Sequence, residues 1–153
     1  PGHCFHHHAF LLGDNLFAGD AAGASVDSTG FISVTSAPPQ FHLEHTLSSI
    51  DRLVSLNPVN LYLTHFGSVD SPSGHLASYC DAVELNALFI QQRLAEGMDP
   101  DSLQVAYEAF QMEQAFRSSV GQDTWATLQL VNGTAMCADG IRLYWEKLAK
   151  DQT

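Results

Sequence analysis

The sequence predicts an α/β fold over residues 1–70, followed by an α-helical extension over residues 71–153. Apolar and more polar residues alternate over residues 59–64, which is the period of a strand. From Leu76 to Leu94 the apolar residues recur every three or four positions, which is the period of an amphipathic helix. We therefore expect two segments, a small sheet with its helix and then a helical region.

The chain begins with a predicted hairpin and a long loop. Over residues 9–20, two short apolar strands flank a Gly-Asp-Asn turn, and the second strand ends at Gly19-Asp20. Residues 23–40 are rich in Gly, Ser, Thr and Pro, so they predict an irregular loop with at most one strand, near residues 31–34. Loops of this length in compact domains are often functional.

A helix and a second strand are expected to follow this loop. Residues 42–56 carry a single apolar stripe, which predicts a helix that Asn57-Pro58 ends. The strand over residues 59–64 then places His65 at its C-terminal end. Because ligands of open α/β sheets gather at the C-terminal ends of strands, His65 is a candidate site residue.

The remainder of the chain is predicted to be helical. One long helix starts near Pro72 and ends before Gly97, which matches the usual placement of these two residues at helix ends. Asp99-Pro100 then fits the N-cap and first position of another helix. A final helical stretch covers residues 124–150, and we expect Gly133 to break or kink it.

Composition excludes several classes of function. The chain has 153 residues, 45% of them hydrophobic and 15% charged, which is typical of a globular protein. Six basic residues face seventeen acidic ones, and the net charge of -11 argues against a nucleic-acid partner. No apolar run approaches the roughly 20 residues that span a bilayer, so we expect no membrane partner. Three cysteines without CxxC spacing favour reduced thiols and a cytoplasmic location.

Three residues are candidate metal ligands. His3 lies in a Gly-containing turn just before a predicted strand, Asp20 directly follows a strand, and His65 ends another strand. Imidazole nitrogens and carboxylate oxygens are ligands for zinc, iron or manganese. Small residues follow Asp20 and leave little side chain near its carboxylate. We therefore expect these three residues to form a metal site.

The motifs that contain these residues occur in a distinctive order. They are Pro1-Gly2-His3, the strand-and-turn segment at residues 10–22 that includes Gly19-Asp20, and the strand at residues 61–67 that includes His65. As an ordered set they resemble the metallo-β-lactamase-fold hydrolase superfamily. The resemblance covers residues 1–70 and implies the C-terminal half of an αββα sandwich. The helical tail is similar to the C-terminal extension of one general hydrolase branch.

The resemblance also implies a role for each candidate ligand. His3 is expected to complete a first metal site, Asp20 to bridge two metals and act in catalysis, and His65 to bind the second metal. Two zinc ions are the implied cofactors, with iron or manganese as alternatives. The implied reaction is hydrolysis of a small ester, lactone, thioester or similar substrate by a metal-activated hydroxide.

One family motif is absent from the chain. The first metal-binding signature, HxHxDH, precedes PGH in the family and does not occur here. The run at residues 6–8 cannot replace it, because consecutive residues of an extended chain point to alternate sides. His6 and His7 are instead expected near the metal site or in a pocket wall. We therefore expect a C-terminal fragment that is inactive alone, an enzyme only when the missing half is present.

A half sandwich would also expose one apolar face of its sheet. Such a face favours self-association, so a homodimer is an expected partner besides a small-molecule substrate. A different class of function is an interaction module that keeps the family motifs for structural reasons and has no catalytic role. A nuclease of the same superfamily is disfavoured by the acidic composition.

Other residues give weaker candidate sites. Cys4 beside His3 suggests a Cys-His nucleophile, but adjacent residues rarely present both groups to one point. His42 and His45 lie one helical turn apart and are more simply explained as solvated residues near a helix start. The remaining candidates are expected to be solvent-facing or capping residues (His75, Asp27 and Asp70) or core aromatics (Trp125, Tyr144 and Trp145).

Overall fold

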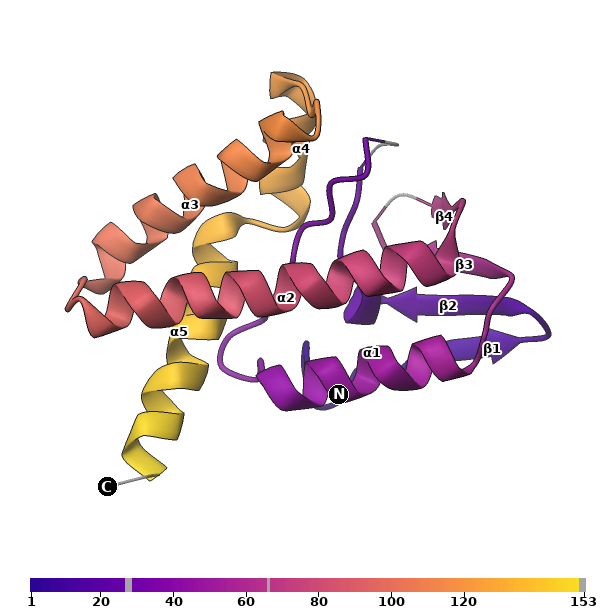
Figure 1. Ribbon diagram of the computed structural model, residues 1–153, viewed down its shortest axis with the longest axis horizontal. Helices are drawn as coiled ribbons and strands as arrows, with labels where there is room; N and C mark the ends of the chain where they lie inside the picture. Colours follow the sequence, from indigo (N-terminus) through magenta and orange to yellow (C-terminus); the bar gives the residue numbers. More distant parts are fainter. Residues whose placement is uncertain (27–28, 66, 152–153) are drawn as a thin grey trace.

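The computed structural model describes residues 1–26, 29–65 and 67–151, and its α/β class agrees with the sequence-based prediction (Figure 1). Asp27 and Phe66 therefore lie outside the described residues. The elements in chain order are β1 (Phe10–Leu12), β2 (Asn15–Gly19), the 3-10 turn η1 (Asp20–Ala22), α1 (Leu43–Ser55), β3 (Asn60–Leu63), β4 (Gly67–Val69), α2 (Pro72–Ala95), α3 (Pro100–Arg117), α4 (Gln122–Val131) and α5 (Thr134–Asp151).

The strands form a mixed sheet in the order β1-β2-β3-β4. β1 and β2 form the predicted antiparallel hairpin, and Gly13 in its turn has a φ of 57°, which favours glycine. β2 and β3 run parallel, with α1 as the crossover between them, and Leu16 pairs with Leu61. This topology brings the C-terminal ends of β2 and β3 together, and with them Asp20 and His65.

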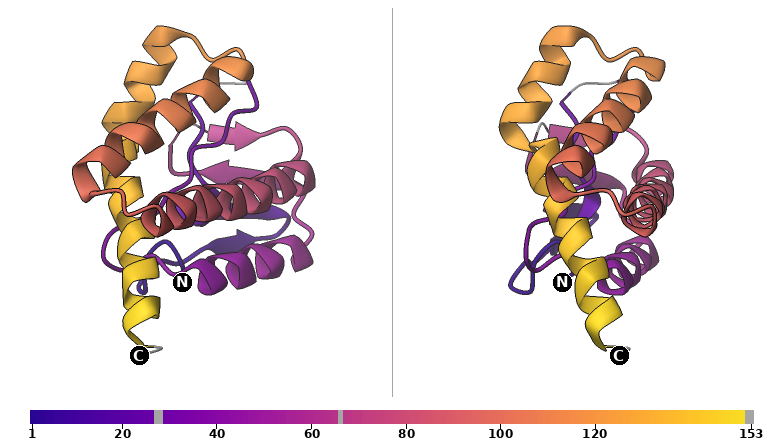
Figure 2. Two further views of the ribbon diagram at one scale, coloured as in Figure 1. Left: turned by 60° about the vertical axis from the view of Figure 1, so that its left-hand side comes forward. Right: turned by 90° about the vertical axis from the view of Figure 1, so that its left-hand side faces the viewer.

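Helices α1 and α2 cover one face of the sheet (Figures 1 and 2). The strand residues that point toward these helices are fully buried, as Leu16, Ala18 and Leu61 show. They meet apolar side chains of the two helices in one core cluster that also extends to α5. The residues predicted as two segments, before and after residue 70, thus share one apolar core.

The opposite face of the sheet carries exposed apolar side chains. Phe10 is 68% exposed, Leu12 72% and Phe17 43%, although phenylalanine and leucine are usually buried. The register pairs Phe10 with Phe17 and Phe17 with Tyr62, so these side chains share a face. The rings of Phe17 and Tyr62 stack with centroids 4.9 Å apart. We call Phe10, Leu12, Phe17 and Tyr62 the open sheet face.

The helical region follows the sequence-based prediction closely. Asp99 caps α3 by accepting the backbone N–H groups of Asp101 and Ser102, and Pro100 is the first helical residue. The predicted break falls between α4 and α5, at residues 132–133. Asn132 fills this break because its Nδ2 donates to Ser33 Oγ and to the Val34 carbonyl, at 2.8 and 3.0 Å. The break therefore ties the helices to the loop at residues 23–40.

Some expectations need correction. A short strand, β4, pairs with β3 and was not predicted, because its three residues show no alternation of their own. His75 does not face solvent: it is half-buried and its Nε2 lies 2.8 Å from the Ala22 carbonyl. Trp125 and Tyr144 are buried, as the core interpretation predicted. In the described parts of the chain, no helix has the length and apolar character needed to cross a bilayer.

Candidate metal centre

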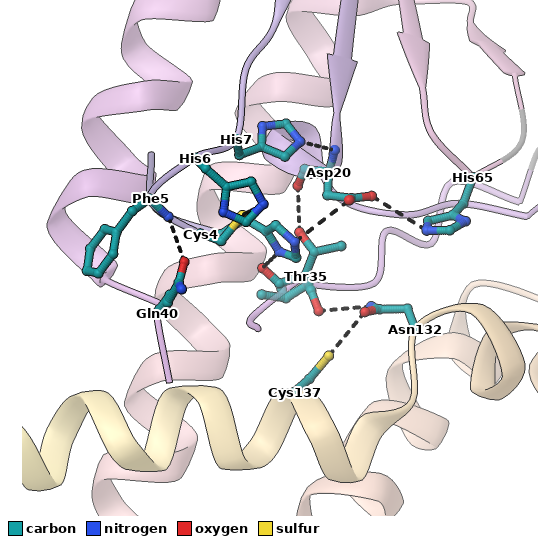
Figure 3. Close-up of polar contacts among 12 residues, drawn as sticks. Cys4, Phe5, His6, His7, Asp20, Thr35, Gln40, His65, Asn132 and Cys137 are labelled. Atoms are coloured by element: carbon teal, nitrogen blue, oxygen red, sulfur yellow. Dashed lines mark hydrogen bonds and ion pairs between the residues drawn. The ribbon is translucent and has the colours of Figure 1, made fainter. Parts of the chain in front are cut away.

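The three predicted ligands lie together at the C-terminal edge of the sheet, where Figure 3 labels Asp20 and His65. His3 comes from the segment before β1, Asp20 begins the 3-10 turn after β2, and His65 lies in the turn after β3. The parallel pairing of β2 with β3 brings the last two residues together although they are far apart in sequence. Their metal-binding role stays a prediction, and the geometry described below shows how well the site would suit it.

Each oxygen of the Asp20 carboxylate faces a different imidazole. His3 Nε2 lies 3.7 Å from Oδ2, and His65 Nε2 lies 3.5 Å from Oδ1. Two ligands at about 2.1 Å from one tetrahedral zinc ion lie about 3.4 Å from each other. Each of the two nitrogen–oxygen pairs therefore has approximately the separation of two ligands on one metal ion.

The orientation of His3 would suit a metal ligand. Its Nδ1 lies 3.2 Å from the Thr35 carbonyl oxygen, and because a carbonyl can only accept, Nδ1 carries the proton. In the neutral ring Nε2 then presents a lone pair toward the Asp20 carboxylate. Metal-binding histidines commonly donate their other ring N–H to a backbone carbonyl in this way. Two acceptors face each other here, which is an arrangement that a cation between them stabilises.

The Asp20 carboxylate contains an unsatisfied atom. Oδ1 is buried and has no hydrogen-bond partner, whereas buried polar atoms are normally paired. Leaving a buried charged acceptor unpaired costs about 1–3 kcal/mol or more. Oδ1 also lies 3.5 Å from His65 Nε2, and a metal ion between the two atoms would remove this cost, so the Asp20 carboxylate fits a metal.

Backbone hydrogen bonds hold Asp20 in place. Its N–H donates to His7 Nε2 at 2.9 Å, and its carbonyl accepts from Thr35 Oγ1 at 2.6 Å. Thr35 Oγ1 also lies 3.0 Å from the hydroxyl of Tyr79, which is fully buried. These bonds use the main chain of Asp20 and leave its carboxylate directed at His3 and His65.

His7 and His6 differ in their surroundings. His7 accepts from Asp20, so its Nε2 carries no proton, and burial lowers the pKa of His7 below its usual value. It is therefore a neutral neighbour that orients Asp20. His6 is exposed, and its Nε2 lies 3.8 Å from the thiol of Cys4. The structure thus brings one of the two residues predicted near the site into contact with a candidate ligand.

The described residues contain no group of three or more His, Cys, Asp or Glu side chains that could hold one metal ion. The geometry explains this, because His3 and His65 approach different oxygens of Asp20 and form two pairs. The arrangement supplies two ligands to each of two positions. Further ligands are needed to complete either position, since catalytic zinc usually has three protein ligands.

Other candidates lie outside this centre. His42 and His45 stack on each other at 3.9 Å between centroids, and His42 also contacts Tyr144, so this pair packs at the start of α1. Sequence reasoning missed Thr35, which binds both His3 and Asp20. Thr35 lies in the irregular loop and has no local motif, so no sequence signal could have found it.

Comparison with known proteins gives partial support for the resemblance. Among curated proteins, the chain is similar to a metallo-beta-lactamase fold-containing protein of Sulfurisphaera tokodaii. The two are 33% identical over 69 residues, which are 45% of this chain and 25% of the relative. The chain therefore matches about a quarter of the length of that relative. The match supports the resemblance to metallo-β-lactamase-fold proteins that the motifs indicate.

The other comparisons give no match. No family model matches the chain, and no solved structure matches it significantly. The relationship to metallo-β-lactamase-fold proteins therefore depends on the ordered motifs and on the curated relative together.

Proposed function

We propose that this chain contributes the C-terminal half of a metallo-β-lactamase-type αββα sandwich to a dinuclear metal-dependent hydrolase. One observation carries the proposal, namely that the two oxygens of Asp20 face two separate imidazoles, His3 and His65. This arrangement is suited to a carboxylate that bridges two metal ions. The similarity to a metallo-beta-lactamase fold-containing protein supports it.

In this proposal His3 would hold one metal ion, His65 would hold the other, and the Asp20 carboxylate would contribute a ligand to each. Bound zinc would polarise the scissile carbonyl and lower the pKa of a water molecule toward about 7. Zinc suits imidazole and carboxylate ligands, and iron or manganese suits them as well. Asp20 fixes the two positions relative to each other, and His7 and Thr35 hold the main chain of Asp20. The substrate is a small ester, lactone or thioester.

Residues beyond this set must complete the metal centre. His3, Asp20 and His65 supply two ligands to each position, which is fewer than a catalytic metal ion needs. The activity is therefore proposed for the assembled centre, and these three residues alone would bind metal weakly. The compartment proposed is the cytoplasm, a proposal that the free thiols of Cys4, Cys80 and Cys137 support.

The test replaces Asp20 with Asn, which preserves its shape and removes its charge. We expect Asp20→Asn to lose most zinc binding in isothermal titration and all metal-dependent ester hydrolysis in the assembled enzyme. Asp123→Asn is the matched control, because Asp123 is an exposed acid in the first turn of α4, outside the cluster. Unchanged zinc affinity in Asp20→Asn, with the fold intact by circular dichroism, would overturn the assignment.

The open sheet face favours a second function, that of a non-catalytic interaction module. Phe10, Leu12 and Phe17 form a contiguous apolar surface, and such surfaces commonly mark sites of protein association. The occupant of this face can be a second copy of the chain. The two functions differ in metal content: an interaction module binds no metal stoichiometrically, and His65→Ala would leave its partner binding unchanged.

A further inference from the structure

A cavity of about 460 Å³ is lined by residues of the loop after η1, of β3 and β4, and of the start of α2. Ile32, Leu63 and Val69 give it an apolar side, and its other lining residues come from the loop at Ser25 and Gly30, from Ser68 and Asp70, and from the start of α2. The volume falls within the range of small-molecule sites, which is about 300–1,000 Å³. The cavity is therefore large enough for part of a small substrate.

The cavity and the candidate metal centre share structural elements. His75 lines the cavity, and its Nε2 donates to the carbonyl of Ala22 at 2.8 Å. Ala22 belongs to the same 3-10 turn that begins with Asp20. His65 lies in the turn between β3 and β4, and both strands contribute to the cavity wall through Leu63 and Ser68. A ligand in the cavity would therefore lie next to the turns that hold two candidate ligands.

Among the described residues, the polar part of the cavity wall is rich in hydroxyl groups and poor in charge. None of the chain's six Lys and Arg residues, all of which lie in described parts of the structure, lines it. Asp70 brings a negative charge, and burial lowers the pKa of His75, which keeps that ring neutral near pH 7. The hydroxyl-bearing side chains of the wall are Ser25, Ser68, Ser71 and Ser78.

The residues of the wall determine which chemical groups of a ligand the cavity can bind. A hydroxyl both donates and accepts hydrogen bonds, so serines suit hydroxyl and amide groups of a ligand. A carboxylate or phosphate in the cavity would meet Asp70 without a cationic partner, and recognition of such groups usually relies on Arg or Lys. An uncharged polar ligand is not repelled by Asp70 and needs no cationic partner.

We propose that this cavity binds the uncharged, hydroxyl- or amide-bearing part of an ester substrate and discriminates against anionic substrates. The proposal rests on the proposed hydrolase function, since it names the substrate class of that site. The serine-rich wall would bind the polar group, the apolar side would contact its carbon chain, and the ester bond would extend toward Asp20. Phosphate groups of a substrate are disfavoured within the cavity by the negative charge of Asp70.

The test compares a neutral ester with its anionic counterpart by nuclear magnetic resonance. The probes are ethyl 3-hydroxybutyrate and 3-hydroxybutyrate, each titrated into the ¹⁵N-labelled chain with a chelator present to prevent hydrolysis. We expect the ester to shift the amide signals of Ser68, Ser71 and Ser78 in a saturable way. The anion should bind at least about tenfold more weakly, a factor that corresponds to about 1.4 kcal/mol. Equal affinities, or ester-induced shifts confined to other residues, would overturn the proposal.

A lysine placed in the cavity and a lysine placed outside it on the same helix give a matched pair of variants. Ser78 and Ser73 are both exposed residues of α2, but only Ser78 lines the cavity. We expect Ser78→Lys to strengthen binding of the anion severalfold at the cavity and Ser73→Lys to leave the preference for the ester unchanged. The same gain in both variants would show general charge attraction and would contradict a specific cavity.

The outcome separates this proposal from the proposed function. If the ester binds in the cavity while Asp20→Asn and the unmodified chain bind zinc equally, the hydrolase assignment fails and the cavity remains a site for neutral polar ligands. If Asp20 is needed for zinc binding and the ester does not bind in the cavity, the cavity proposal fails alone.

Discussion

His7 Nε2 accepts a hydrogen bond from the backbone N–H of Asp20, at 2.9 Å across a sequence separation of 13 residues. This bond fixes the start of the 3-10 turn that carries the Asp20 carboxylate. Gly19 makes it possible, because a Cβ at position 19 would lie 2.5 Å from the same Nε2. The position of the proposed bridging carboxylate therefore depends on a neutral imidazole and on a glycine beside it.

Replacing His7 should weaken metal binding without removing a metal ligand. In His7→Ala the Asp20 N–H loses its acceptor, so the turn is free to rotate and the carboxylate is less well oriented. Loss of such an orienting partner typically lowers metal affinity by about 10–100-fold. Zinc titration calorimetry of the purified chain measures this change.

His8→Ala is the control for that measurement, because His8 is the next residue and is exposed. We expect its zinc affinity to stay close to that of the unmodified chain. If His7→Ala also retains full affinity, the hydrogen bond does not position Asp20.

Replacing Gly19 with Ala should destabilise the fold more than replacing Gly13. Both glycines have positive φ, 59° at Gly19 and 57° at Gly13, so an alanine at either position is strained, and the ψ of −136° at Gly19 places it in a region that only glycine normally adopts. At Gly19 the new Cβ would also contact the His7 ring, whereas at Gly13 no atom lies within 4 Å. Urea denaturation of both variants measures the difference in the free energy of unfolding.

The double variant separates the contact from the backbone strain. His7→Ala removes the ring that the new Cβ meets, so Gly19→Ala should cost less in the His7→Ala background than in the unmodified chain. If the losses of unfolding free energy in the two single variants add up to the loss in the double variant, the cost at Gly19 comes from its backbone conformation alone.

The sequence predicts those elements whose signals are local. The stripe of α1, the hairpin turn at Gly13 and the cap at Asp99 each depend on residues a few positions apart, and the structure contains all three. β4 was missed because its hydrogen bonds come from β3, so its three residues need no pattern of their own.

Long-range contacts explain what sequence reasoning missed in the site. His75 follows a Ser-Pro-Ser-Gly stretch, which suggested an exposed loop, but its partner is the Ala22 carbonyl, 53 residues away. Thr35 supports His3 and Asp20 from within an irregular loop. His3, Asp20 and His65 could be selected because they occur in recognisable motifs, and their proximity follows from parallel pairing of β2 and β3.

His75 should make stability fall at acid pH. Burial lowers the pKa of folded His75 below 6.5, although its hydrogen bond to Ala22 opposes this shift. Between the folded pKa and about 6.5 the unfolded chain binds more protons at this residue, so stability rises with pH there. The stabilisation that depends on neutral His75 is complete above about pH 6.5. It is lost as the pH drops through the pKa of His75 in the folded chain. His75→Gln, whose amide can still donate to Ala22, should reduce this dependence.

Urea denaturation between about pH 5 and about pH 7.5 measures that change. Burial also lowers the pKa values of His7 and His42, so part of the dependence should remain in His75→Gln. Ser73→Gln is the control, because Ser73 is exposed on the same helix and neither serine nor glutamine titrates in this range, so the pH profile should stay unchanged. An identical profile for His75→Gln and the unmodified chain would assign the dependence to other groups.

Polar substitutions on the open sheet face should reduce self-association without loss of stability. Phe10 and Leu12 are mostly exposed in the single chain, so Phe10→Ser and Leu12→Ser remove little buried apolar area on folding. They remove apolar surface that a second copy would bury, so the dissociation constant of a homodimer should rise by at least about tenfold, which corresponds to about 1.4 kcal/mol. Sedimentation velocity over a concentration series measures the shift. Val105→Ser is the matched control, because Val105 is exposed to a similar extent on α3. A homodimer that Val105→Ser weakens as much as Leu12→Ser does would not use the open sheet face, and its interface would have to be sought on the helices.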